Sequence, residues 1–256
     1  GFMFDIDAYL RRIGISERPA EPSYRTLAML QYAHLTHVPY ETMDIVRRVP
    51  FSIASDAVYE KVVVRGRGGY CFELNGLFTR LLRELGYPVT EYFGRFLRDA
   101  DPGIPMRRHR VLRVTASDGC DYICDVGVGG VCPLTPLPFV PHTVTSEQNG
   151  TWRIETYPFY GYVVEEYKRG EWRQYYCFTL DPCADIDYEA ADWYCQTSPH
   201  SFFRDRPIVA LQTETGRRTL SGDMFRVFDG ERVEEICVTD TETRDRLLKE
   251  RFGIVF

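Results

Sequence analysis

A cysteine at position 71 lies where the sequence could activate a thiol. It follows a glycine-rich turn, Arg65-Gly-Arg-Gly-Gly-Tyr, and begins a segment with the apolar spacing of an amphipathic helix. The free N–H groups and the positive end of a helix dipole favour the thiolate, and glycines allow backbone or substrate to approach closely. Cys71 is therefore a candidate nucleophile. A buried structural cysteine or a phosphate-binding turn would also fit this local pattern.

A nucleophilic cysteine needs a base, and the chain has five histidines. His109 opens a predicted strand, and Asp125 lies in a second apolar strand, where an unpaired carboxylate would be costly to bury. A carboxylate that accepts from one imidazole nitrogen orients the other toward the thiol. The alternatives are a surface position for His109 and a capping role for Asp125 before Gly127. Cysteine, histidine and aspartate in this order indicate thiol acyl transfer without identifying the acceptor.

The elements that must position these residues follow a simple order along the chain. Apolar spacing predicts a helix that ends at Pro39, a helix from Cys71 to Gly86, and a final helix over 241–251. Turn signals at 101–103 and 117–119 separate predicted strands, and the proline-rich segment 133–141 suits a linker or a loop crossing a cleft. The predicted strands cover residues 89–93, 110–114, 122–126, 151–157, 161–167, 171–178, 207–212 and 224–238. Helices, then mostly antiparallel strands, then a mixed part predict an α+β fold of three packed sub-domains.

The composition excludes several classes of protein. Among 256 residues, 31 Lys and Arg face 37 Asp and Glu, so the net charge of −6 favours neither nucleic acid nor an anionic membrane as partner. No apolar run is long enough to span a bilayer, and no signal peptide is visible. We therefore expect a cytoplasmic protein whose eight cysteines are free thiols. Their spacing does not match zinc ligands, so we expect no metal.

Four sequence motifs resemble those of the arylamine N-acetyltransferase family. They stand in the order found in that family and extend over about residues 20 to 225. The nucleophile motif is Arg67-Gly-Gly-Tyr-Cys71-Phe-Glu-Leu-Asn75, and the upstream Pro-Phe-Glu-Asn element corresponds to Pro39-Tyr40-Glu41-Thr42. The other triad positions match His109 and Asp125-Val-Gly-Val-Gly129, and the segment from Cys195 to Phe203 looks like Thr-Ser-Pro-x-Ser-x-Phe.

The resemblance implies both a fold and an activity. The fold would have an N-terminal helical bundle over 1–86 with the nucleophile, a β-barrel over 87–190 with the histidine and aspartate, and an α/β lid over 191–256. Its core would resemble that of cysteine proteases. The activity would be ping-pong transfer of acetyl from the co-substrate acetyl-CoA to an arylamine, arylhydrazine or related amine, through an acetyl-cysteine, as in xenobiotic metabolism.

The resemblance also implies roles for individual residues. Cys71 would be the nucleophile, His109 its base and Asp125 the orienting carboxylate. Tyr40 and Val128, where the family usually has phenylalanine, would border the acceptor pocket. Gly129, Thr197 and Ser201 would accommodate coenzyme A, and Glu41 would pair with Arg67 to anchor the loop 66–70.

Two other readings use the same residues differently. Transglutaminases, cysteine proteases and amide synthases that form macrocycles also use Cys, His and Asp in this order, with a different acyl donor. A binding module without activity would need no reactive thiol. Turnover of acetyl-CoA with a small arylamine distinguishes the first reading from both.

Overall fold

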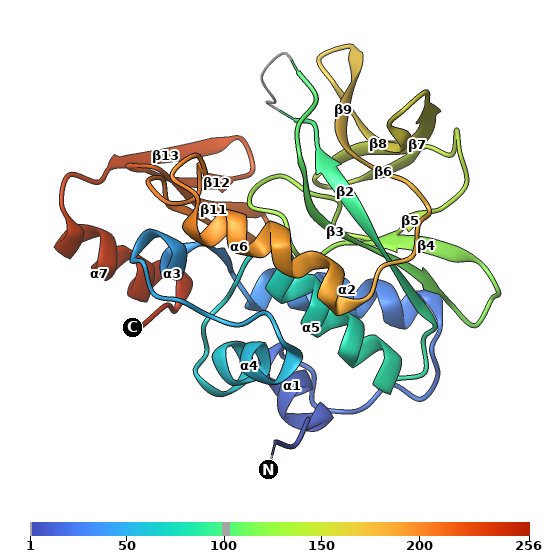
Figure 1. Cartoon of the computed structure of the whole chain (residues 1–256), viewed down its shortest axis with the longest axis horizontal. Helices are drawn as coiled ribbons and strands as arrows, with labels where there is room; N and C mark the ends of the chain where they lie inside the picture. Colours follow the sequence, from blue (N-terminus) through green and yellow to red (C-terminus); the bar gives the residue numbers. More distant parts are fainter. Residues whose placement is uncertain (1, 99–102) are drawn as a thin grey trace.

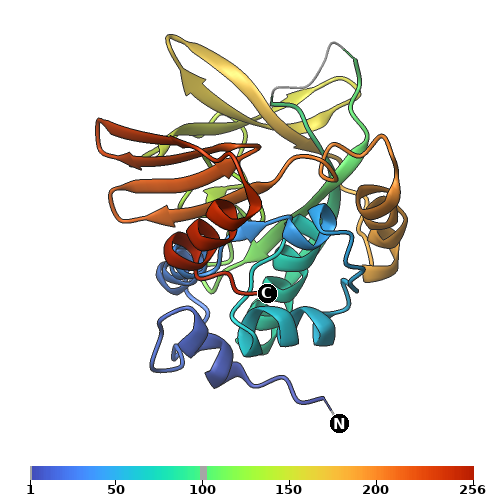
Figure 2. The same cartoon turned by 90° about the vertical axis from the view of Figure 1, so that its left-hand side faces the viewer.

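The computed structural model describes residues 2–98 and 103–256. The predicted turn at 101–103 therefore lies mostly outside the described residues. In Figures 1 and 2 the N-terminal helices lie at one end of the molecule, and two sheets lie beyond them. In the described part of the chain, no helix combines the length and apolar character needed to cross a membrane.

The N-terminal part consists of helices packed around α5 (Figure 1). These elements are α1 (Ile6–Arg12), α2 (Tyr24–His37), α3 (Met43–Val46), α4 (Ser55–Tyr59), the π-helical turn η1 (Glu60–Val64) and α5 (Cys71–Glu84). Helix α2 is capped by the Ser23 hydroxyl, which accepts from the Thr26 N–H at 3.1 Å, and it ends before Pro39 as the sequence predicts. Helix α5 buries its apolar face against strand β3 (Arg107–Thr115), which fixes the position of Cys71 at its first turn.

A large antiparallel sheet of eight strands follows. Its strand order is β5-β4-β3-β2-β9-β8-β7-β6. Besides β3, the strands are β2 (Val89–Phe96), β4 (Asp121–Cys124), β5 (Leu137–Pro138), β6 (Thr145–Glu147), β7 (Gly150–Tyr157), β8 (Gly161–Lys168) and β9 (Glu171–Phe178). The antiparallel strands predicted in this region are thus present.

The two ends of this sheet are joined through a side chain. Glu147 in β6 accepts hydrogen bonds from the Thr135 N–H at 3.1 Å and the Thr135 hydroxyl at 2.6 Å, and from the Leu134 N–H. Both donors lie just before β5, so the sheet is almost closed into a barrel. The proline-rich segment 133–141 supplies β5 and this seam, which its composition alone did not indicate.

Strand β3 carries an irregularity beside the predicted histidine. Gly94 of β2 pairs with His109, and the next residue of β2, Arg95, pairs with Arg107. Arg108 therefore has no partner in β2 and is the extra residue of a β-bulge. Bulges bend a strand locally and redirect the side chain of the extra residue.

The C-terminal part forms a second, five-stranded sheet with the order β1-β10-β11-β12-β13. Its strands are β1 (Tyr40–Glu41), β10 (Ile208–Thr213), β11 (Gly216–Ser221), β12 (Met224–Asp229) and β13 (Arg232–Cys237). The single predicted strand over 224–238 is two strands, because Gly230 at φ +62° makes a tight turn between them. Strand β1 comes from the N-terminal part, so the chain crosses between the predicted sub-domains here.

Three further elements complete the chain. The short 3₁₀ turn η2 (Asp185–Tyr188) leads into α6 (Glu189–Thr197), and α7 (Thr241–Phe252) follows β13. Leu248 and Phe252 of α7 pack against Phe225 of the second sheet. The left-handed Gly253 at φ +70° ends α7, as predicted.

Candidate active site

A cavity of about 700 Å³ is lined by two of the predicted triad residues, Cys71 and His109, and by both predicted acceptor positions. Cys71 reaches it from the start of α5, His109 from β3, and Val128 and Gly129 from the loop after β4. Tyr40 of β1 and the segment 202–203 add aromatic walls. A cavity of this size fits a small aromatic ligand and part of a second substrate.

The thiol of Cys71 is buried although it faces the cavity. Only 4 % of the residue is exposed, and the thiol donates to the Arg108 carbonyl oxygen at 3.3 Å. Burial raises the pKa of the Cys71 thiol above its ordinary value, and the nearby Cys195 raises it further, while the charge of Arg108 lowers it. Burial thus opposes the helix dipole, and ionisation of this thiol requires a cationic partner.

His109 and Asp125 form a buried pair. The imidazole Nε2 lies 2.7 Å from the Asp125 Oδ2, and each residue is less than 5 % exposed. This contact leaves Nδ1 as the ring nitrogen able to exchange a proton with a thiol in the same cavity. The Asp125 carboxylate is therefore paired, as expected from the cost of burying it alone.

Asn75 holds the aspartate in place. Its side-chain amide donates to the Asp125 Oδ1 at 3.0 Å, and its amide oxygen accepts from the Val126 N–H at 2.9 Å. Asn75 lies four residues after Cys71, on the same face of α5. Sequence reasoning assigned it no role, although this spacing was a usable signal.

Two glycines allow the loop after β4 to approach the nucleophile. A Cβ atom at Gly127 would lie 2.8 Å from the Cys71 Cα, and one at Gly129 would lie 2.7 Å from the Tyr40 ring. Any side chain at either position would push the loop away from the cavity.

The structure separates Thr197 and Ser201 from the other predicted site residues. Neither is among the described residues that line the cavity. The Thr197 hydroxyl donates to the Trp193 carbonyl at 2.6 Å, and the buried Ser201 hydroxyl donates to the Cys195 carbonyl at 2.6 Å. Both hydroxyls are used within their own segment, and their coenzyme A role stays a prediction.

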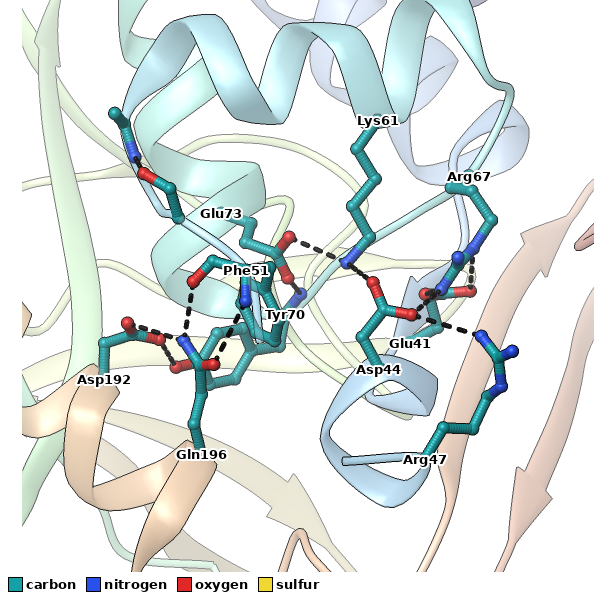
Figure 3. A network of polar contacts seen from close by, with 12 residues as sticks. Glu41, Asp44, Arg47, Phe51, Lys61, Arg67, Tyr70, Glu73, Asp192 and Gln196 are labelled. Atoms are coloured by element: carbon teal, nitrogen blue, oxygen red, sulfur yellow. Dashed lines mark hydrogen bonds and ion pairs between the residues drawn. The ribbon is translucent and has the colours of Figure 1, made fainter. Parts of the chain in front are cut away.

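Glu41 and Arg67 form a buried ion pair (Figure 3). The Arg67 Nη2 lies 2.6 Å from Glu41 Oε1 and the Arg67 Nε lies 3.3 Å from Glu41 Oε2. The side chains are 0 % and 3 % exposed, respectively. The pairing inferred from the sequence is thus present, and it joins β1 to the loop 66–70.

This pair belongs to a larger charged network that sequence reasoning missed. Asp44 lies 3.0 Å from Arg67 and 3.2 Å from Lys61, and Lys61 lies 2.9 Å from Glu73 (Figure 3). Glu73 also accepts from the Tyr70 N–H at 3.1 Å, directly before the nucleophile. Burial raises the pKa of Glu73 to about 7 against the opposing charge of Lys61. No sequence pattern connects these residues, because they meet only through the fold.

The residues described hold no group of three or more His, Cys, Asp or Glu side chains suited to a metal ion.

Comparisons with known proteins find similar sequences and similar folds over nearly the whole chain. Residues 23–256 match a family model described as N-acetyltransferase. The arylamine N-acetyltransferase of Mycolicibacterium smegmatis is 34% identical over 255 residues, which cover 98% of this chain and 92% of the relative. Human arylamine N-acetyltransferase 1 is 29% identical over 273 residues, covering 98% of this chain and 94% of that protein.

Solved structures agree with these relatives. The Mycobacterium marinum arylamine N-acetyltransferase in complex with CoA has a TM-score of 0.89 at 32% identity, over 98% of this chain and 93% of that one. The Bacillus cereus arylamine N-acetyltransferase, which has a Cys-His-Glu catalytic triad, has a TM-score of 0.89 at 26% identity. That match covers 99% of this chain and 100% of the other. In the present chain the residue bonded to the histidine is Asp125.

Proposed function

This chain belongs to the arylamine N-acetyltransferase family, and from that premise we propose that it carries acetyl from acetyl-CoA on Cys71 to an arylamine, arylhydrazine or related amine. The observation that carries the proposal is the buried His109–Asp125 pair, 2.7 Å apart, whose histidine lines the same cavity as Cys71. A histidine fixed by a carboxylate next to a cysteine is the arrangement that nucleophilic acyl transfer requires.

In the first half-reaction, His109 Nδ1 takes the thiol proton of Cys71. The thiolate attacks the thioester carbonyl carbon of acetyl-CoA, and the bond to the CoA sulfur breaks. The departing CoA thiolate takes the proton from the imidazolium, which leaves acetyl-cysteine and free CoA. Asp125 stabilises the imidazolium while it exists, and this stabilisation offsets the burial that raises the pKa of the thiol.

In the second half-reaction, the amine nitrogen attacks the acetyl carbonyl on Cys71 and loses a proton to His109. The carbon–sulfur bond breaks, and the returning thiolate recovers the proton. Asn75 keeps Asp125, and through it His109, in one orientation for both steps.

The remaining assignments belong to the same proposal. Tyr40 and Val128 border the acceptor, and Gly129 leaves room for the pantetheine end of the donor. We propose the division into 1–86, 87–190 and 191–256, with the last part as a lid. Eight free cysteines support the proposed cytoplasmic location.

The direct test is mass spectrometry of the enzyme given acetyl-CoA without an amine. We expect one added acetyl mass on the peptide that contains Cys71, and its loss when an arylamine is added. Cys71→Ser should form no adduct and keep less than about a hundredth of the activity, because loss of a nucleophile costs several powers of ten. Cys195→Ser, which changes another buried cysteine of the same cluster, is the matched control and should still be acetylated. An adduct on another cysteine in the wild type would contradict the assignment.

A further inference from the structure

We propose that Arg108 selects an acceptor amine whose aromatic ring carries a carboxylate, by binding that carboxylate in the cavity beside Cys71. The inference rests on the proposed acetyl transfer. It adds the charge of the acceptor, which membership of the family does not specify.

The β-bulge explains how Arg108 reaches the cavity. In a regular strand, neighbouring side chains point to opposite faces, so Arg108 and His109 could not both face one cavity. Because Arg108 is the extra residue of the bulge, its side chain lines the same cavity as His109. Its carbonyl oxygen accepts from the Cys71 thiol at 3.3 Å. The main chain of Arg108 is therefore in direct contact with the nucleophile.

In the described part of the chain, the charge of Arg108 lacks the carboxylate partners that other inward-facing arginines have. Arg67, Arg98 and Arg110 each form an ion pair with a buried carboxylate. Within residues 2–98 and 103–256, the side chain of the half-buried Arg108 has no hydrogen-bond partner and no carboxylate within 4 Å. The described lining of the cavity also contains no Asp or Glu. An anionic ligand would find a cation here that no carboxylate of the described residues neutralises.

The walls around Arg108 suit a flat ring. Its guanidinium lies 4.9 Å from the centroid of the Phe202 ring and 5.2 Å from that of Phe203, and Phe96 and Val128 line the same space. A guanidinium binds a carboxylate through two parallel N–H donors, which fixes direction as well as charge. An amine on one side of an aromatic ring would then face Cys71 while a carboxylate on the other side faces Arg108.

A carboxylate on the acyl group of the donor would offer Arg108 the same chemistry. The aromatic walls favour the acceptor as its source, because the acyl chain of a dicarboxylic donor has no ring to place between them. The experiment therefore includes both sources.

The test compares 4-aminobenzoate with the neutral and nearly isosteric 4-aminobenzamide at saturating acetyl-CoA. For Arg108→Gln we expect kcat/KM for 4-aminobenzoate to fall about ten- to hundredfold, mainly through KM, as expected for a lost charge-assisted hydrogen bond. The value for 4-aminobenzamide should fall much less, only as far as the lost charge raises the pKa of Cys71 and slows its reaction. Arg108→Lys, which keeps the charge without the two-pronged geometry, should lie between. Arg107→Gln is the matched control, because Arg107 is its exposed neighbour in β3, and it should alter neither value.

Three results would overturn the inference. Equal losses with both acceptors, with slower release of CoA in the first turnover, would mean that Arg108 acts only on Cys71 and does not bind the carboxylate. A selective loss with succinyl-CoA relative to acetyl-CoA, at an unchanged acceptor ratio, would place the carboxylate on the donor. If the wild type has the same kcat/KM for 4-aminobenzamide and 4-aminobenzoate, the inference about Arg108 is wrong, but the proposed acetyl transfer is not. If the wild type acetylates no arylamine, the proposed function itself fails.

Discussion

The buried pair Glu41–Arg67 gives a prediction about stability that can be worked out from its surroundings. Arg67→Met would leave Glu41 buried, with no other cation within 4 Å among the described residues. Stranding a buried charge costs about 3 to 5 kcal/mol of the free energy of unfolding. We expect Arg67→Met to lower stability by an amount in that range.

Glu41→Gln should cost less, because Arg67 keeps Asp44 at 3.0 Å. The loss is that of a charge-assisted hydrogen bond, about 1.5 to 3 kcal/mol. The double variant removes both charges, so its loss should be smaller than the sum of the single losses. The coupling energy between the two positions should reach about 1 to 3 kcal/mol, within the range for residues in direct contact.

Urea unfolding of the four proteins measures this coupling, with the slope m checked for constancy. The chain provides a matched control in Asp7 and Arg18, whose N···O distances of 2.8 and 3.3 Å resemble those of the buried pair. Their side chains are 53% and 54% exposed, so the same cycle should give at most about 1 kcal/mol. If the coupling energy of Glu41 and Arg67 is no larger than that of Asp7 and Arg18, burial does not strengthen the pair and the prediction is wrong. The buried variants should also slow acetylation of Cys71, because the pair anchors the loop 66–70.

Two other predictions concern selectivity and pH. Val128→Phe should change the ratio of kcat/KM between small and bulky arylamines by about 1 to 3 kcal/mol, measured with a panel of amines. This change should be larger than the change in the rate of enzyme acetylation. Burial lowers the pKa of His34 from an ordinary 6.5 to about 3. Below pH 6.5 the unfolded chain therefore binds a proton that the folded chain does not, and the free energy of unfolding should fall by about 2 kcal/mol at pH 5. Urea unfolding at pH 7 and pH 5 should show that His34→Gln no longer loses this stability. The exposed control His200→Gln should lose as much as the wild type. An unchanged pH dependence in His34→Gln would contradict the assignment.

The parts of the site that the sequence predicted are those with a local signal. A helix beginning at Cys71 follows from apolar spacing, and the pairing of Asp125 follows from the cost of burying a lone carboxylate. The main helices and strands follow from periods of 3.6 and 2 residues. The catalytic roles of Cys71, His109 and Asp125 stay predictions until the acetyl-enzyme is examined.

The parts that the sequence did not predict depend on contacts between distant segments. Lys61 of η1 meets Asp44 of α3 and Glu73 of α5 only through the fold, and no spacing rule relates them. The bulge at Arg108 depends on the register between β2 and β3, which is a property of the two strands together and not of either strand alone. Short strands such as β5 have too few residues to show any period.

The pairing of β1 with β10 has a consequence for how the protein is made. Tyr40 pairs with Ala210, and Ile208 and Val209 line the cavity that Cys71 and His109 also line. A ribosome releases residue 71 and residue 109 long before it releases residue 208. The nascent chain thus carries its reactive residues for much of its synthesis without one wall of their cavity. Such long-range contacts form late and slow folding. Catalytic competence should appear only when nearly the whole chain has emerged, so that incomplete translation products bind no substrate.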